Sequence, residues 1–333
     1  MVRRQFKDNR SFAGAVKSQM NPKRACNGGQ YIVFSPVSEE QLTKIERLRD
    51  ASYKQLRFMY LIDKQALIVK MLGETHELAA SQFTRFLWRK AASVRPGLDD
   101  ELVDIRTTTF TGRLHKKEGD SAYKPLSTRA KKGSWPTLVL EVGVSEKIGK
   151  LQLDAKWWLE NSSTQVNTVL VFAITEETQV ILIEQWEMVS AASPAGTRSG
   201  NFDIPTRITF FQIPPADPPQ LPTDPSQPSQ SAGDSSPPPA NSSPPPADSS
   251  QPPTNSFPSP ADSSKSPVDS SPPPADSSQA SEASEDPEAT EAIRLNFKKL
   301  FDREPTKGST EGDLVFTISE FTAWARAVWG ATQ

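Results

Sequence analysis

The chain is poor in the residues that build disulfides and histidine metal sites. Its 333 residues include one cysteine, Cys26, and two histidines, His76 and His115. A single cysteine excludes an intrachain disulfide, and nothing in the spacing of the two histidines favours a shared metal. The sequence also lacks a glycine-rich phosphate loop and a nucleophile elbow. Carboxylates and lysines are therefore the candidates for chemistry.

Long apolar runs are missing as well. The sequence has no stretch of about 18 apolar residues, the length that a membrane-spanning helix needs. Its first residues carry basic side chains in place of the apolar core of a secretory signal. We therefore expect an intracellular protein, cytoplasmic or nuclear, with no membrane partner.

Proline and serine are concentrated in one part of the chain. Residues 213–290 are mostly Pro, Ser, Ala, Asp and Gln, so a disordered insertion is expected there. A Pro/Ser-rich heptad repeat runs through it, with Asp or Asn before Ser at positions 234, 241, 248, 255, 262, 269 and 276. Three of the seven repeats contain three consecutive prolines, which forbid a helix and favour extended chain. The segment could bind adaptor domains, and a repeat without a specific role is an equal alternative.

The remaining sequence divides into three parts. Residues 31–212 have the composition and length of one folded core. Residues 291–333 predict a C-terminal strand and helix that pack on this core, because so short a piece cannot bury its aromatic side chains alone. Residues 1–30 hold seven basic side chains against one acid, Asp8, which predicts a disordered basic tail, with a transit peptide or a nuclear address as the alternative.

Charge is distributed unevenly along the chain. The net charge is −2, but residues 1–212 carry 31 Lys+Arg and 23 Asp+Glu (+8), whereas residues 213–333 carry 7 and 17 (−10). A basic folded part with an acidic tail suits an anionic partner such as nucleic acid. Ordinary surface variation is an equally weighted alternative.

Hydrophobic periodicity predicts the elements of the first half. Ser38 opens a capping box, which predicts a helix over 39–51. Two apolar runs, 56–62 and 66–72, predict a β-hairpin, with one long helix as the alternative. A second helix is expected at about 76–92 with Thr75 as its cap, and a strand at 102–110. Residues 113–132 are expected to form a polar, basic connection.

The second half contains the most apolar segment. Residues 138–144 are almost all leucine and valine, which predicts an interior strand covered on both faces. A helix at about 146–160, capped by Ser145, should follow it. Residues 168–174 predict a central strand, with neighbours at 179–186 and 206–212. The expected architecture is α/β (α+β) with a mixed sheet flanked by helices.

Glu141 interrupts the apolar strand. A buried charge costs several kcal/mol, on the order of ion burial penalties, unless a basic group, a metal or a cleft compensates it. Asp120 precedes it by about twenty residues in the basic connection, and the two carboxylates can share one divalent cation. Oxygen ligands suit Mg²⁺ or Mn²⁺. A strand-end glutamate paired with Lys or Arg, and a solvated loop aspartate, are the alternatives.

Three segments carry a family resemblance. Residues 120–125 (DSAYKP), 136–143 (PTLVLEVG) and 154–162 (DAKWWLENS) resemble an uncharacterised fungal group in the PD-(D/E)XK nuclease superfamily, with a restriction-endonuclease-like core. The resemblance implies that Asp120 and Glu141 are the catalytic and metal-binding acids. The motif lysine two residues after the acid is replaced by Gly143. The resemblance then offers Lys150 as catalytic lysine, with Lys147 and Lys156 next, and Glu77 as an additional acid.

Three functions remain open from the sequence. The first is a metal-dependent nuclease, a phosphodiester hydrolase using Mg²⁺ or Mn²⁺. The second is an inactive nuclease-fold module that binds nucleic acid through a set of basic residues. This set comprises Arg113, Lys116, Lys117, Lys131 and Lys132. The third is a scaffold that acts through the Pro-rich segment.

Overall fold

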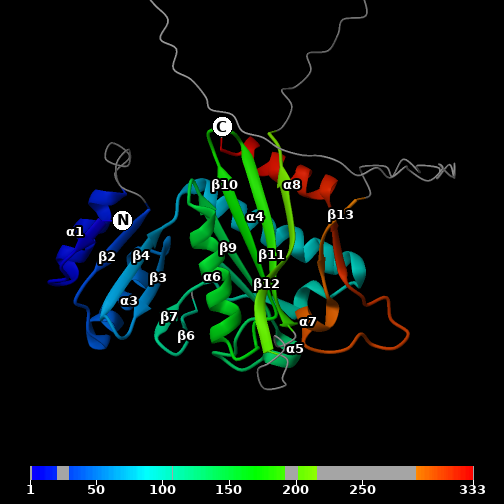
Figure 1. Cartoon of the computed structure of the whole chain (residues 1–333), viewed down its shortest axis with the longest axis horizontal. Coiled ribbons are helices and arrows are strands. Elements are labelled where there is room, and N and C mark those ends of the chain that lie inside the picture. The colour runs from blue at the N-terminus through cyan, green and yellow to red at the C-terminus, as the bar shows by residue number, and fades with distance from the viewer. Residues whose placement is uncertain (1, 21–29, 107, 192–201, 216–289, 333) are drawn as a thin grey trace, which may run out of the picture. The chain divides into compact units, whose positions relative to one another are not determined.

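The computed structural model describes residues 2–20, 30–106, 108–191, 202–215 and 290–332. Within them the chain forms two six-stranded sheets and one two-stranded sheet, with helices against the two larger sheets (Figure 1). This confirms the mixed α/β architecture. Apart from its ends, the expected insertion 213–290 lies outside the described residues. None of the described helices combines the length and the apolar character needed to cross a membrane.

One of the two six-stranded sheets has shorter strands and is called the smaller sheet; the other is called the larger sheet. The smaller sheet is built from the N-terminal part of the chain. Its strand order is β1-β2-β4-β3-β7-β6. The strands are β1 (Val2–Arg4), β2 (Tyr31–Phe34), β4 (Ala66–Met71), β3 (Leu56–Leu61), β7 (His115–Lys117) and β6 (Phe110–Thr111). Strands β3 and β4 pair antiparallel, which confirms the predicted hairpin and removes the long-helix alternative.

Two helices cover one face of this sheet. They are α1 (Asn9–Gln19) and α3 (Glu39–Ser52), and the capping box at Ser38 is present as predicted. Helix α1 corrects the expectation of a tail over residues 1–30. Asp8 caps it through the amide of Ser11, and Phe12 and Val16, one helical turn apart, are fully buried. The basic charge of this segment masked its short apolar stripe.

The larger sheet carries the central strands. Its order is β12-β11-β10-β9-β8-β5. The strands are β12 (Phe202–Ile213), β11 (Val180–Ala191), β10 (Thr168–Thr175), β9 (Leu138–Val144), β8 (Ser121–Pro125) and β5 (Leu102–Asp104). Strands β9 and β10 are parallel neighbours and almost wholly buried, so the predicted interior strands are confirmed. The other neighbouring strands pair antiparallel.

Helices cover both faces of the larger sheet. Helix α4 (Glu74–Val94) and helix α8 (Ile318–Gly330) share a hydrophobic core with one face, and α6 (Ile148–Asn161) shares one with the other (Figure 1). The C-terminal segment also supplies β13 (Glu291–Leu295), α7 (Phe297–Phe301) and β14 (Leu314–Thr317). Its Phe321 and Trp324 contact Phe172 of β10 edge to face, at centroid distances of 6.2 and 5.1 Å.

The predicted polar connection over 113–132 is wrong in part. It contains β7, β8 and a short helix, α5 (Leu126–Arg129). The strand expected at 102–110 is split between β5 and β6, after a 3-10 turn at Asp99–Glu101. Two caps also differ, because Gly73 and Lys147 precede α4 and α6 in place of Thr75 and Ser145. The lysines in 113–132 hid these strands, because Lys117 is buried against Glu141 and Asp154 and Lys124 is buried with its ammonium donating to the Lys131 carbonyl.

Candidate active site

Adjacent strands of the larger sheet bring the two predicted acids together. Strand β8 begins one residue after Asp120, and Ser121 pairs with Leu140 of β9. Continuing this antiparallel register by one residue places Asp120 beside Glu141. Their exposed fractions are 2% and 3%. Both line one cavity of about 50 Å³ between the two sheets and α6, so the structure joins residues separated by twenty positions.

Asp120 accepts hydrogen bonds from two donors and has the His76 imidazole close to the same oxygen. Its Oδ2 accepts from the Lys70 ammonium and from the Val142 amide, each at 2.8 Å. The Nε2 of His76, at the start of α4, lies 3.1 Å from the same oxygen. Burial alone would raise the pKa of Asp120, but Lys70 and His76 outweigh it and hold this pKa well below its usual range. Asp120 is therefore an anion at neutral pH.

Glu141 has the opposite electrostatic character. Its Oε1 accepts from the Trp158 indole at 2.5 Å and lies 3.0 Å from the Lys117 ammonium. Burial raises the pKa of Glu141 to about 7, with a further contribution from the carboxylates of Asp120 and Asp154, while Lys117 opposes the rise. A carboxyl group that titrates near neutral pH is suited to accepting a proton from water.

Lysines link the acids into a continuous network. Lys117 also lies 2.6 Å from Asp154 of α6, and Lys150 lies 2.9 Å from the other oxygen of Asp154 and 3.1 Å from Glu146. Burial would raise the pKa of Asp154, but Lys117 and Lys150 lower it. Each ammonium is thus shared between oxygens.

The space around Gly143, where the resemblance led us to expect a lysine, is narrow. A Cβ added at Gly143 would lie 2.7 Å from Leu151 and 3.1 Å from Glu146, both close to the start of α6. A larger side chain at this position would first have to displace the side chains of Leu151 and Glu146. Ammonium groups reach the acids from other elements instead, Lys70 from β4 and Lys117 from β7. Lys70 was not predicted as a site residue; its signal was a lone cation in an otherwise apolar strand.

The remaining predicted residues occupy different places. Lys150 lines the cavity beside Asp120 and Glu141. Lys147 is exposed, Lys156 lies 5.6 Å from the Trp186 ring, and Glu77 faces Arg57 at 3.5 Å. Neither Lys147, Lys156 nor Glu77 lines the cavity.

The five basic candidates for nucleic-acid contact are also dispersed. Arg113, Lys131 and Lys132 are exposed. Lys116 is half-buried and donates to Glu39 at 2.8 Å. Lys117 is 4% exposed and faces the acids, so its expected place among surface contacts is corrected to a place inside the site.

The cavity adjoins a larger groove. The groove measures about 810 Å³ and lies where β9 ends and α4 and α6 begin. Tyr31 and Lys150 line both spaces. The Tyr31 hydroxyl donates to Glu146 at 2.6 Å, and the Lys150 ammonium lies 4.3 Å from the Tyr31 ring. These two side chains separate the acids from the open groove.

The unusual protonation of Glu141 predicts a pH effect on stability. Its folded-state pKa of about 7 exceeds the ordinary value of 4.5, so its stabilising contribution is complete below pH 4.5 and is lost as pH rises through 7. Glu141→Gln should remove that loss. The difference in unfolding free energy between variant and wild type should grow by about 3 kcal/mol from pH 4.5 to 7.5. Urea unfolding across this range measures it; a constant difference would contradict the assignment.

Comparisons with known proteins give limited similarity. No family model matches the chain, and no curated protein matches it. Among solved structures, the chain is similar to the crystal structure of a "putative nuclease belonging to DUF820" from Anabaena variabilis. The identity is 15% and the TM-score 0.26, over 41% of this chain and 80% of that one.

Proposed function

We propose that the protein is nuclease-like and hydrolyses phosphodiester bonds of nucleic acid at the Asp120–Glu141 cavity. The observation that carries the proposal is the pairing of two buried carboxylates with different proton affinities around one cavity. The ammonium groups of Lys70, Lys117 and Lys150 line the same cavity. Anion-binding and proton-accepting groups thus lie within reach of one bound phosphate.

The oxygen donors are compatible with a divalent cation. Asp120, Glu141 and the Val142 carbonyl offer oxygens, which Mg²⁺ and Mn²⁺ prefer, and Mg²⁺ commonly uses one or two protein carboxylates together with substrate phosphate. In the part of the chain that the structure describes, no group of three or more His, Cys, Asp or Glu side chains forms a ready-made metal site. The cation is therefore expected to bind together with the substrate.

The chain's own residues divide the chemical work. A bound divalent cation would polarise the phosphodiester and acidify water. Glu141 accepts the proton of the attacking water through a carboxyl group that titrates near pH 7 in the metal-free protein, with a pKa of about 7. Trp158 fixes the Glu141 carboxyl group through its indole N–H. Lys117 offsets the negative charge that develops at the phosphate.

A second candidate function is supported by the position of Lys70. Its ammonium donates to Asp120 at 2.8 Å and to the Val142 carbonyl at 2.6 Å. The Lys70 ammonium thus already binds Asp120 and the Val142 carbonyl, two of the three groups whose oxygens could hold a divalent cation. If a divalent cation does not displace Lys70, the protein is a nuclease-fold module that binds nucleic acid without cutting it.

Cleavage assays separate the two functions. The full chain should cut fluorescein-labelled single- or double-stranded oligonucleotides in about 5 to 10 mM Mg²⁺ or Mn²⁺. EDTA should abolish the cutting. Binding without cutting in either metal would reject hydrolysis and support the second function. Neither cutting nor binding would reject both.

A further inference from the structure

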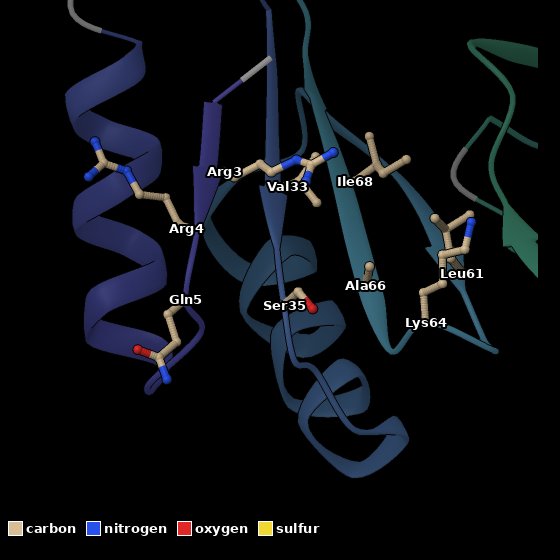
Figure 2. Close-up of a pocket in the computed structure, with 9 residues that line it drawn as sticks. All are labelled: Arg3, Arg4, Gln5, Val33, Ser35, Leu61, Lys64, Ala66 and Ile68. Atoms are coloured by element: carbon tan, nitrogen blue, oxygen red, sulfur yellow. The ribbon is translucent and has the colours of Figure 1, made fainter.

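A second groove, different from the one beside Tyr31 and Lys150, lies on the face of the smaller sheet that also lines the cavity. It is called the groove from here on. This groove measures about 540 Å³. It is lined by Arg3, Arg4, Gln5, Val33, Ser35, Leu61, Lys64, Ala66 and Ile68 (Figure 2). Three of these residues are cationic and none is acidic. The groove is therefore positively charged, with an apolar floor.

Strand alternation connects this groove to the catalytic cavity. Ala66, Ile68 and Lys70 of β4 point to one face, because every second side chain does. Ala66 and Ile68 line the groove, and Ile68 and Lys70 line the cavity. The four-residue step from Ala66 to Lys70 spans about 13 Å at ~3.3 Å per residue. The two spaces are consecutive parts of one sheet face.

The cations of the groove are available to an outside anion. Arg3 and Lys64 are exposed, and in the described parts of the chain neither lies within 4.0 Å of a carboxylate. The three lysines of the cavity, in contrast, all have carboxylate partners. Arg3 and Lys64 therefore carry positive charge without an internal structural role.

Figure 2 shows how the groove side chains are directed. Arg3 extends across β2 toward Val33 and Ile68, and Lys64 rises from the turn between β3 and β4. Arg4, the next residue, is directed toward α1 instead. The ligand-facing charge therefore comes from Arg3 and Lys64 on opposite sides of the apolar floor formed by Val33, Ala66 and Ile68.

We infer that this groove binds the sugar–phosphate backbone of a single nucleic-acid strand and leads it to the cavity, an inference that rests on the proposed function. Phosphates require unpaired cations spaced along a path, which Arg3 and Lys64 supply. The cavity measures about 50 Å³ and its two acids are 2% and 3% exposed, so a phosphate reaches them only where the backbone bends sharply, which a single strand does more easily than a stiff duplex. No aromatic side chain lines the groove, so binding is to the backbone and independent of sequence.

Fluorescence anisotropy tests the inference with the full chain in EDTA, using a fluorescein-labelled oligo(dT) of about a dozen nucleotides. The double variant Arg3→Ala/Lys64→Ala should bind roughly tenfold more weakly at 0.1 M salt. The slope of log K against log salt should fall in magnitude by about 1.4, since each lost single-strand phosphate contact contributes ~0.7. The control is Arg10→Ala, an exposed arginine of α1 outside the groove, which should leave affinity and slope unchanged.

Three results would overturn the inference: wild-type affinity and slope in the double variant, an equal loss in Arg10→Ala, or tighter binding of a duplex or of poly-glutamate than of the single strand. Because EDTA prevents metal-dependent cutting, this result is separate from the hydrolytic proposal. Groove-dependent binding without cutting in Mg²⁺ would support the groove and reject hydrolysis. Cutting with unaltered binding in the double variant would support hydrolysis and reject the groove.

Discussion

Asp120→Asn and Glu141→Gln should each reduce phosphodiester cleavage by about 10²- to 10⁴-fold, the usual contribution of a positioned acid or base. Both substitutions keep the shape of the side chain. Asparagine removes the negative charge from a carboxylate that accepts from Lys70 and the Val142 amide. Glutamine removes the proton acceptor whose pKa is about 7. Initial rates with a labelled oligonucleotide in Mg²⁺ and Mn²⁺ provide the measurement.

The matched control for this prediction is Glu160→Gln. Glu160 is an exposed carboxylate on α6, the helix that carries Asp154, and it does not line the cavity. The cleavage rate of Glu160→Gln should stay within about twofold of the wild-type rate, as expected for a surface substitution. Full activity in both site variants would remove the two acids from the mechanism. The pH profile adds a second readout, because the ascending limb near pH 7 should disappear in Glu141→Gln.

The sequence was sufficient for the central architecture because burial leaves a simple pattern. Residues 138–144 and 168–174 are too apolar for strands with a wet face, and they became the parallel neighbours β9 and β10. The capping box at Ser38 marked a true helix start, since it satisfies an amide that would otherwise lack a partner.

Segments whose stability depends on distant partners were not predictable from local pattern. Residues 113–132 read as a solvated loop because charge dominates their composition. In the fold, Lys117 is buried against Glu141 and Asp154, which lie 24 and 37 residues further along the chain. Its burial is stabilised only after β7, β9 and α6 come together. A single sequence contains the charges but not their pairing.

The candidate site was also predictable only in part: its acids could be proposed from the sequence, and its lysine partners could not. Asp120 and Glu141 could be proposed from the sequence because an acid inside an apolar strand needs compensation. The catalytic lysine was expected on the helix after the strand, at Lys150. Lys150 does line the cavity, but it pairs with Asp154 and Glu146. The lysines against Asp120 and Glu141 come from earlier strands, a consequence of packing two sheets that local spacing does not encode.

Lys117→Met should lower the free energy of unfolding by about 3 to 5 kcal/mol, the usual cost of removing one partner of a buried ion pair. Methionine retains an unbranched apolar side chain, so the main change is loss of the ammonium between Glu141 and Asp154. Asp154 keeps Lys150 as a partner, whereas Glu141 keeps, among the residues that the structure describes, only the Trp158 indole as a hydrogen-bond donor. Urea unfolding at pH 8 measures the loss.

The pH dependence of that loss identifies its cause. Burial already raises the pKa of Glu141, and without Lys117 this pKa should rise further. At pH 5.5 the carboxyl group then takes up a proton, so Lys117→Met should cost less there than at pH 8. The double variant Lys117→Met/Glu141→Gln should recover part of the stability at pH 8, because no uncompensated charge remains at residue 141.

Lys116→Met is the control: its partner Glu39 is exposed, so its cost in unfolding free energy should stay within about 1 kcal/mol. Equal losses in Lys116→Met and Lys117→Met, independent of pH, would show that packing, and not the buried ion pair, holds this strand in place.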